Sequence, residues 1–130
     1  MPLKMYDANL CNFEEKFKSF ASETPSNHIS LILFLADKNP SSNLSWCPDC
    51  NRAEPVIYQK VADCNRDVAL LRAFAGDRAT WRKADHPWRV DQRFRLSGVP
   101  TLVRWVDGDI RGRLEDTEAD IPEKIDSILN

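Results

Sequence analysis

The stretch Ser45–Cys50, SWCPDC, places two cysteines three positions apart. This spacing is shared by zinc sites, short structural disulfides and redox-active dithiols. Pro48 suits the first turn of a helix, where its missing N–H loses no partner, and residues 53–61 carry apolar side chains at helical spacing. A helix is therefore predicted to begin directly after Cys47, with Pro55 inside it removing one hydrogen bond and bending its axis.

The residues before this stretch predict a buried strand. Residues 29–36, ISLILFLA, are almost all apolar, which is typical of a strand covered on both faces. A polar loop over residues 37–45 then leads to the cysteines. In sheets flanked by helices, functional groups gather where strands end and helices begin. The dithiol is expected at such a junction.

Further elements are predicted on both sides of this junction. They are a helix after an Asn12–Glu15 capping box, strands over residues 68–74, 101–106 and 110–114, a tight turn at Asp107–Asp109, a short helix over 88–96, a last helix with an Asp120–Glu123 capping box, and an additional strand over 4–8. This order predicts a single α/β domain over residues 1–130. Its mixed central β-sheet has four or five strands and is flanked by helices on both faces.

Composition is that of a soluble globular protein. The chain is 42% hydrophobic and 29% charged, and its net charge of −2 gives no drive toward nucleic acid or an anionic membrane. The arginines between residues 78 and 95 alternate with aspartates, so no nucleic-acid surface is predicted there. No apolar run suits a signal peptide or a membrane span. We therefore expect a cytoplasmic monomer in a reducing compartment.

The other cysteines and the histidines weigh against a metal site. A zinc site commonly needs a second pair of closely spaced ligands. The remaining candidates do not form such a pair in the sequence; they are Cys11, Cys64, His28 and His86. A structural disulfide is disfavoured in a reducing compartment, and closing so short a loop gains little stability. A pair of inert thiols stays open as an alternative. A dithiol beside a βαβ pattern favours redox chemistry without a bound metal or cofactor, and Cys11 and Cys64 are interpreted as structural or incidental.

The two cysteines of the motif are expected to have different roles. At the N-terminus of a helix, free N–H groups and the helix dipole stabilise a thiolate on Cys47. That thiolate attacks a substrate disulfide, and Cys50, one turn further and more buried, resolves the mixed disulfide. The acid Asp49 opposes part of the helix effect, so the pKa of Cys47 is predicted to fall to roughly 5.5–7.5.

Four motifs resemble the thioredoxin family. They are Trp46–Cys50 (WCPDC), the helix proline Pro55, Gly98–Thr101 (GVPT) and the turn Asp107–Gly108. The resemblance narrows to the Clot subgroup of thioredoxin-related proteins through the stretches FLAD, AGDR, HPWRVD and GVPTLVRW, which begin at residues 34, 75, 86 and 98. It runs from about residue 29 to residue 116.

This resemblance implies a thioredoxin fold and a thiol–disulfide oxidoreductase that acts as a disulfide reductase. Its electrons would come from NADPH through thioredoxin reductase, and its substrates would be small-molecule or selected protein disulfides. The resemblance also implies a cis peptide bond before Pro100, with the Val99 backbone beside Cys47 and able to pair with an extended substrate. Trp46 is expected to lie against the active site and shield the disulfide.

Two departures from the family pattern concern the centre of the motif and a buried acid. Pro48–Asp49 stands where thioredoxins have Gly-Pro. Thioredoxins also carry a buried acid in the preceding strand, thought to relay the proton of the resolving thiol, whereas residues 31–36 hold none and Asp37 is expected to point into the loop. We hypothesise that Asp49 partly takes over the proton of Cys50. The alternative is that Asp49 only stabilises the helix N-terminus.

Two other functions stay open at this point. One is a redox-responsive module whose dithiol state controls the binding of a partner protein, and the other is a metal-binding protein. The complete WCPDC and GVPT set favours the reductase, because a binding module needs neither a second cysteine nor a facing proline. The loop Gly76–Pro87 is interpreted either as a wall that restricts substrates or as a solvated surface anchored by one tryptophan.

Overall fold

The computed structural model describes residues 3–130. Its elements, in chain order, are β1 (Leu3–Ala8), α1 (Phe13–Glu23), β2 (Ile29–Leu35), α2 (Pro48–Ala62), β3 (Val68–Phe74), α3 (Arg78–Trp81), α4 (Pro87–Val90), β4 (Thr101–Val106), β5 (Asp109–Glu115), the 3-10 turn η1 (Asp116–Asp120) and α5 (Pro122–Leu129). The predicted strands correspond to β1 through β5, and the helix predicted after Cys47 corresponds to α2.

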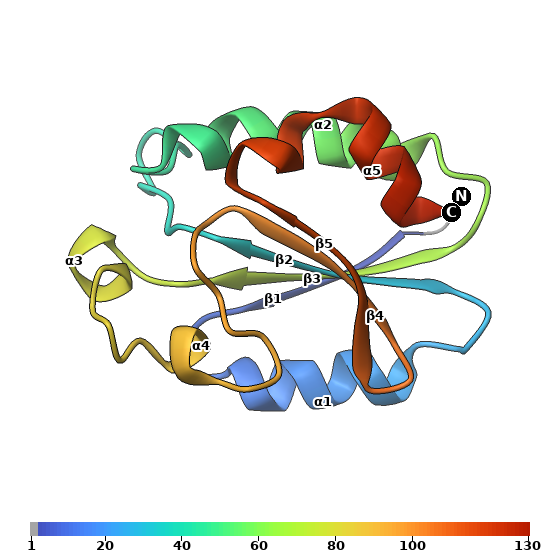
Figure 1. The fold of residues 1–130 in the computed structure, drawn as a ribbon, viewed down its shortest axis with the longest axis horizontal. Coiled ribbons are helices and arrows are strands. Elements are labelled where there is room, and N and C mark those ends of the chain that lie inside the picture. The colour runs from blue at the N-terminus through green and yellow to red at the C-terminus, as the bar shows by residue number, and fades with distance from the viewer. Residues whose placement is uncertain (1–2) are drawn as a thin grey trace.

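The five strands form one mixed sheet in the order β1–β3–β2–β4–β5. β1 and β2 run parallel to β3, whereas β4 runs antiparallel to β2 and β5 antiparallel to β4. Figure 1 shows α2 and α5 on one face of the sheet and α1 on the other. The prediction of a mixed sheet covered on both faces is therefore confirmed.

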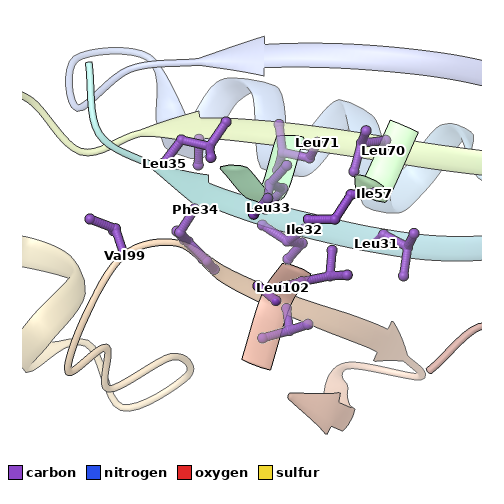
Figure 2. Close-up of a cluster of buried hydrophobic side chains, with 14 of the residues drawn as sticks. Leu31, Ile32, Leu33, Phe34, Leu35, Ile57, Leu70, Leu71, Val99 and Leu102 are labelled. Atoms are coloured by element: carbon purple, nitrogen blue, oxygen red, sulfur yellow. The ribbon is translucent and has the colours of Figure 1, made fainter. Parts of the chain in front are cut away.

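β2 is the centre of the hydrophobic core. Apart from Ser30, each of its residues is buried, because strands cover both of its edges and helices cover both faces of the sheet. Its side chains meet apolar residues of β3, β4 and α2, and Val99 lies at the end of this cluster where β2 ends (Figure 2). Burying each leucine or isoleucine contributes about 1.5–3 kcal/mol. The buried β2 therefore fixes the position at which the loop leading to Cys47 begins.

The predicted short helix over residues 88–96 is wrong in length. α4 ends at Val90, because the side chain of Asp91 accepts the backbone N–H of Arg93 at 2.8 Å and so closes a local turn. Asp favours such turns over the continuation of a helix. Arg95 then has a φ of 45°, which takes the chain further from helical geometry.

Both predicted capping boxes are also wrong. The Asn12 side chain accepts the N–H of Asn9 at 2.8 Å, outside α1, and makes no cap bond to the helix. α5 has Ile121, and not Asp120, at its cap position. A capping box forms instead at the start of η1, between the two ends of Glu115–Glu118. The sequence pattern indicated helix starts correctly to within a few residues but not the bonds that close them.

The turn that joins β4 to β5 has the predicted geometry. φ is 53° at Asp107 and 80° at Gly108, the left-handed values of a type I′ turn, which matches the twist of a hairpin. Figure 1 shows this turn at the end of the sheet opposite to the start of α2. The first residues of β1 and the end of α5 lie on that same side. The dithiol therefore occupies the other end of the molecule.

Candidate active site

Cys47 caps the start of α2. Its backbone is extended, with φ −101° and ψ 105°, and its Sγ accepts the backbone N–H of Cys50 at 3.2 Å. Pro48 lies in the first turn of the helix, as predicted. Both cysteines are free thiols, and Cys50 is 1% exposed while Cys47 is 6% exposed. The more buried thiol is the one that was expected to resolve the mixed disulfide.

The two thiols have opposed acidities. The side-chain hydrogen bond with Cys50 lowers the pKa of Cys47 to about 7, with burial acting in the opposite direction and the Cys50 N–H adding to the decrease. The same side-chain hydrogen bond, followed by burial, raises the pKa of Cys50. The value for Cys47 lies within the predicted range. Near neutral pH, Cys47 is the thiol that ionises, and Cys50 keeps its proton.

The loop before β4 faces the dithiol. The Val99–Pro100 peptide bond is cis, as predicted. The Cys47 thiol donates to the carbonyl oxygen of Val99 at 3.5 Å, which confirms the expected position of this backbone. Thr101 Oγ1 donates to the carbonyl of Gly98 at 2.7 Å, and this bond joins the two ends of the loop. Contact between substrate and the Val99–Pro100 backbone stays a prediction.

Trp46 is held by the chain that follows β3. Its indole Nε1–H donates to the carbonyl of Gly76 at 3.2 Å, the same oxygen that accepts the Asp37 N–H at 3.1 Å. The Arg78 guanidinium donates to the Trp46 carbonyl at 3.1 Å and lies 5.2 Å from the centre of the indole ring. Asp37 Oδ1 accepts the N–H of Gly76 at 3.0 Å, so the side chain of this acid bonds to the chain that follows β3. Arg78 was not predicted as a site residue, because only the fold brings it to the motif.

Two carboxylates of α2 have different surroundings. Asp49 forms an ion pair with Arg52, whose guanidinium also lies 3.7 Å from Asp120. Glu54 is 7% exposed, and its carboxylate lies 2.8 Å from the ammonium of Lys38. A buried carboxylate is costly unless it is paired, and Lys38 supplies that pairing.

Glu54 lies one helical turn beyond Cys50. Residues four apart on a helix share one face, and both of these side chains are buried. The negative charge of Glu54 is among the causes that raise the pKa of Cys50. Its other oxygen accepts the hydroxyl of Tyr58 at 3.2 Å. Glu54 was not predicted as a site residue, although its spacing of four residues from Cys50 is visible in the sequence.

Pro55 lies inside α2, as predicted. It has no N–H to donate to the carbonyl of Asn51, so the first turn of the helix is linked to the rest by one bond fewer. The carbonyl of Cys47 still accepts the N–H of Asn51 at 3.2 Å. The first turn that carries the dithiol is therefore formed before the interruption.

The chain between β3 and β4, residues 76–97, is built around its own buried side chains; we call it the 76–97 segment. Trp81 and Trp88 are buried, with the buried ring of His86 against both. His86 Nδ1 accepts the N–H of Trp88 at 3.1 Å, so Nε2 carries the proton and donates to the carbonyl of Ala75 at 2.8 Å. Most residues of the loop Gly76–Pro87 are exposed while its one tryptophan, Trp81, is buried, so the interpretation of this loop as a solvated surface anchored by one tryptophan is confirmed. A role in substrate selection stays a prediction.

Residues 3–130 show neither a cluster suited to a metal ion nor a helix that could cross a membrane. Within residues 3–130, no set of three or more His, Cys, Asp and Glu side chains is arranged to hold a metal ion. Cys11 is exposed and Cys64 is half-buried. None of the helices in that same range is long and apolar enough to cross a membrane.

Solved structures define the fold. A reduced thioredoxin pre-protein of Schistosoma mansoni matches with a TM-score of 0.58 over 98% of this chain and 99% of that chain, at 12% identity. A mutant thioredoxin of Halobacterium salinarum also gives a TM-score of 0.58, over 98% of this chain and 92% of that chain, at 19% identity. The protein has the thioredoxin fold, as predicted.

Sequence relatives define the family more narrowly. A family model described as the thioredoxin domain of thioredoxin domain-containing protein 17-like proteins matches residues 9–130. The thioredoxin-like protein Clot of Arabidopsis thaliana is 52% identical over 99% of this chain and 97% of its own length. The thioredoxin-like protein Clot of Oryza sativa subsp. japonica is 48% identical over 100% of this chain and 98% of its own length. The chain belongs to the thioredoxin domain-containing protein 17-like family, and the resemblance to the Clot subgroup is confirmed. Membership supports a redox function of the thioredoxin type.

Proposed function

We propose that this protein is a thiol–disulfide oxidoreductase that reduces disulfides through Cys47 and Cys50. The proposal rests on the asymmetry of the two thiols: Cys47, with a pKa of about 7, lies against the Val99 carbonyl, whereas Cys50 behind it has a raised pKa. The thiolate is the nucleophile in thiol–disulfide exchange, and an attacking thiol is most effective when its pKa is near the ambient pH.

The reaction proceeds in two exchanges. The Cys47 thiolate attacks one sulfur of the substrate disulfide, forms a mixed disulfide and releases the other substrate sulfur as a thiolate. Cys50 then loses its proton and attacks the Cys47 sulfur, which forms the Cys47–Cys50 disulfide and releases the second substrate thiolate. The substrate gains two electrons and the protein dithiol loses them. Trp46 and the Val99–Pro100 backbone border the substrate during both exchanges.

The proton of Cys50 needs an acceptor in the second exchange. The sequence suggested Asp49, but the geometry supports Glu54 better. Both carboxylates have a cationic partner, Arg52 for Asp49 and Lys38 for Glu54, but Glu54 is buried on the same helix face as Cys50. Glu54→Gln and Asp49→Asn, compared over a pH series, separate the two. The variant that lacks the acceptor slows resolution of the mixed disulfide and changes its pH profile, and an unchanged profile in both variants would remove the idea of a carboxylate acceptor.

The electrons that return the disulfide to the dithiol are proposed to come from NADPH through thioredoxin reductase, with no cofactor bound to this protein. We propose a cytoplasmic monomer that acts on small-molecule or selected protein disulfides. A reducing compartment supports this cycle because it keeps thiols such as Cys11 and Cys64 reduced and returns the active pair to its dithiol form.

A coupled assay tests the proposal. NADPH, thioredoxin reductase and a model disulfide are incubated with the protein, and oxidation of NADPH is followed. The native chain is expected to turn over, whereas Cys47→Ser is expected to lose about 100-fold or more because it lacks the nucleophile. Cys50→Ser is expected to accumulate a mixed disulfide on Cys47, detected by mass spectrometry. Cys64→Ser, a matched thiol outside the site, should turn over normally.

The pH dependence of Cys47 adds an independent readout. Its rate of alkylation by iodoacetamide should rise with pH through about 7, because only the thiolate reacts and the pKa of Cys47 is lowered to that value. The competing interpretation, a binding module controlled by its dithiol state, would show the same alkylation profile but no turnover in the coupled assay. Absence of turnover with every disulfide and reductant supplied would therefore refute the reductase.

A further inference from the structure

Asp116 is fixed against the loop that faces the dithiol. It follows β5, adopts a φ of 52°, and donates its N–H to the carbonyl of Pro100 at 2.8 Å. Its carboxylate fills the space that a Cβ at Gly98 would occupy. Asp116 thus contacts both ends of the loop Gly98–Pro100, through its backbone N–H at Pro100 and its carboxylate at Gly98, and the central carbonyl of this loop lies against Cys47.

The carboxylates around Asp116 already have cationic partners, but Asp116 itself has none. Glu115 pairs with Arg113 at 3.2 Å, and Glu118 pairs with Lys124 at 3.0 Å. No ion pair of Asp116 is formed within residues 3–130, and the residue is exposed. Partial burial and the charges of Glu115 and Glu118 raise the pKa of Asp116, so its ionised form lacks compensation.

The remaining charges near Cys47 do not supply that compensation. Arg52 acts on Cys47, but it is shared between Asp49 and Asp120. Arg52 is therefore already used by two aspartates and does not balance the charge of Asp116 as well. Arg78, on the other side, is held by the carbonyl and ring of Trp46. An incoming cation would therefore find an unpaired carboxylate at the loop where substrate is proposed to bind.

We propose that Asp116 makes the site selective for disulfides that carry a positively charged group, such as an ammonium or guanidinium, close to the sulfur atoms. The carboxylate attracts such a substrate to the Gly98–Pro100 loop and repels an anionic one. The inference rests on the proposed reductase activity of Cys47, and it adds the charge of the substrate that this activity prefers.

A comparison of charged model disulfides tests the inference. The reduced protein is mixed at low ionic strength with cystamine, a dication, or with dithiodipropionate, a dianion, and the rate of each reduction is measured. The ratio of the rate with cystamine to the rate with dithiodipropionate is expected to fall about 25-fold in Asp116→Asn, because one charge a few ångströms away favours the cation and disfavours the anion by about 1 kcal/mol each in a solvent-like environment. Changes in thiolate content cancel in the ratio, since both reactions use the same Cys47.

Two controls keep the result interpretable. Asp109→Asn removes a charge at the far end of β5, in the hairpin turn, and should leave the ratio unchanged. Added salt should reduce the preference of the native protein for cystamine, because salt screens exposed charges. An unchanged ratio in Asp116→Asn, or a native preference indifferent to salt, would overturn the inference while leaving the reductase intact. Failure of the native protein to reduce either compound, or neutral bis(hydroxyethyl) disulfide, would instead remove the proposed function, and the inference with it.

Discussion

The dithiol and the 76–97 segment are built in different ways. The dithiol is local: Cys47 caps its own helix, Pro48 starts it, and the two sulfurs lie one turn apart. The segment has its own buried rings and also bonds to a residue distant in sequence, since Trp46 donates to Gly76 and Arg78 donates to Trp46. The reactive atoms thus come from one short stretch, while their surroundings come from elsewhere in the chain.

This difference separates two kinds of damage. Changes at the cysteines should remove chemistry and leave the fold intact, because among residues 3–130 the hydrogen bonds that link the thiols to distant backbone are those of Cys47 with Val99 and of Cys50 with Ala36. Changes in the 76–97 segment or in the Lys38–Glu54 pair should lower stability first and alter chemistry through the position of Trp46 or the acidity of Cys50. The following substitutions test that separation.

Gly76→Ala should have the largest effect on stability. φ at Gly76 is 104°, a conformation that residues with a Cβ rarely adopt, and the added Cβ would lie 2.9 Å from the Thr80 methyl. We expect a loss of about 3 kcal/mol in the free energy of unfolding, measured by urea denaturation. Gly108→Asn is the matched control, since nothing lies within 4 Å of its Cβ position and Asn tolerates positive φ. Equal losses in both would show that the segment has no special need for glycine.

Glu54→Gln should cost about 2 kcal/mol, because it leaves the Lys38 ammonium half-buried without its counter-charge. It should also lower the pKa of Cys50, since the negative charge that helps to raise it is gone. Denaturation at fixed pH and titration of the thiols measure the two effects. Glu15→Gln, on the exposed face of α1, should change neither. A loss of stability without a change in the pKa of Cys50 would show that Glu54 stabilises the fold and does not affect the acidity of the thiol.

The pH dependence of stability should report on His86. Burial is the main cause that lowers the pKa of His86 in the folded protein. A lowered folded-state pKa of a base means that the unfolded chain binds the proton more readily, so stability is full above about pH 6.5 and is lost as pH falls through the folded-state pKa. A series of unfolding measurements from neutral to acidic pH should show this loss. It should persist in His28→Gln and be absent in His86→Asn.

Arg78→Ala should have the smallest effect, about 0.5–1 kcal/mol, because the guanidinium is exposed and contributes one hydrogen bond and one cation–π contact to Trp46. The fluorescence of Trp46 should change with it, and Arg82→Ala, one turn along, should leave both readings unaltered. A loss comparable to that of Gly76→Ala would mean that the tryptophan depends on the segment more than its contacts indicate.

Local signals predicted most of the fold and the reactive atoms. The apolar run of β2, the hairpin turn Asp107–Gly108 and the position of Pro48 each act within a few residues, so their patterns are readable in the sequence. The Asn12–Glu15 capping box predicted for α1 was wrong, because the Asn12 side chain bonds backward to Asn9 and no sequence pattern separates the two choices.

Long-range partners were the part that the sequence did not reveal. Arg78 and Asp116 meet the active site through tertiary structure, far from the cysteines in the chain. The helix predicted over residues 88–96 failed for a related reason, since Asp91 and the buried His86 favour turns that only the packed segment stabilises. Glu54 is the exception. Its spacing from Cys50 is visible in the sequence, but the sequence does not show that both side chains are buried.

The start of β1 and the end of α5 lie on the side of the molecule away from the start of α2, which carries the dithiol (Figure 1). The protein can therefore be tethered, fused or immobilised through either end while its reactive face remains open. A Cys50→Ser variant coupled to a solid support through its C-terminal end would present Cys47 outward and retain captured substrates for recovery by reduction. The same geometry would let this domain be joined to a larger chain without covering its thiols.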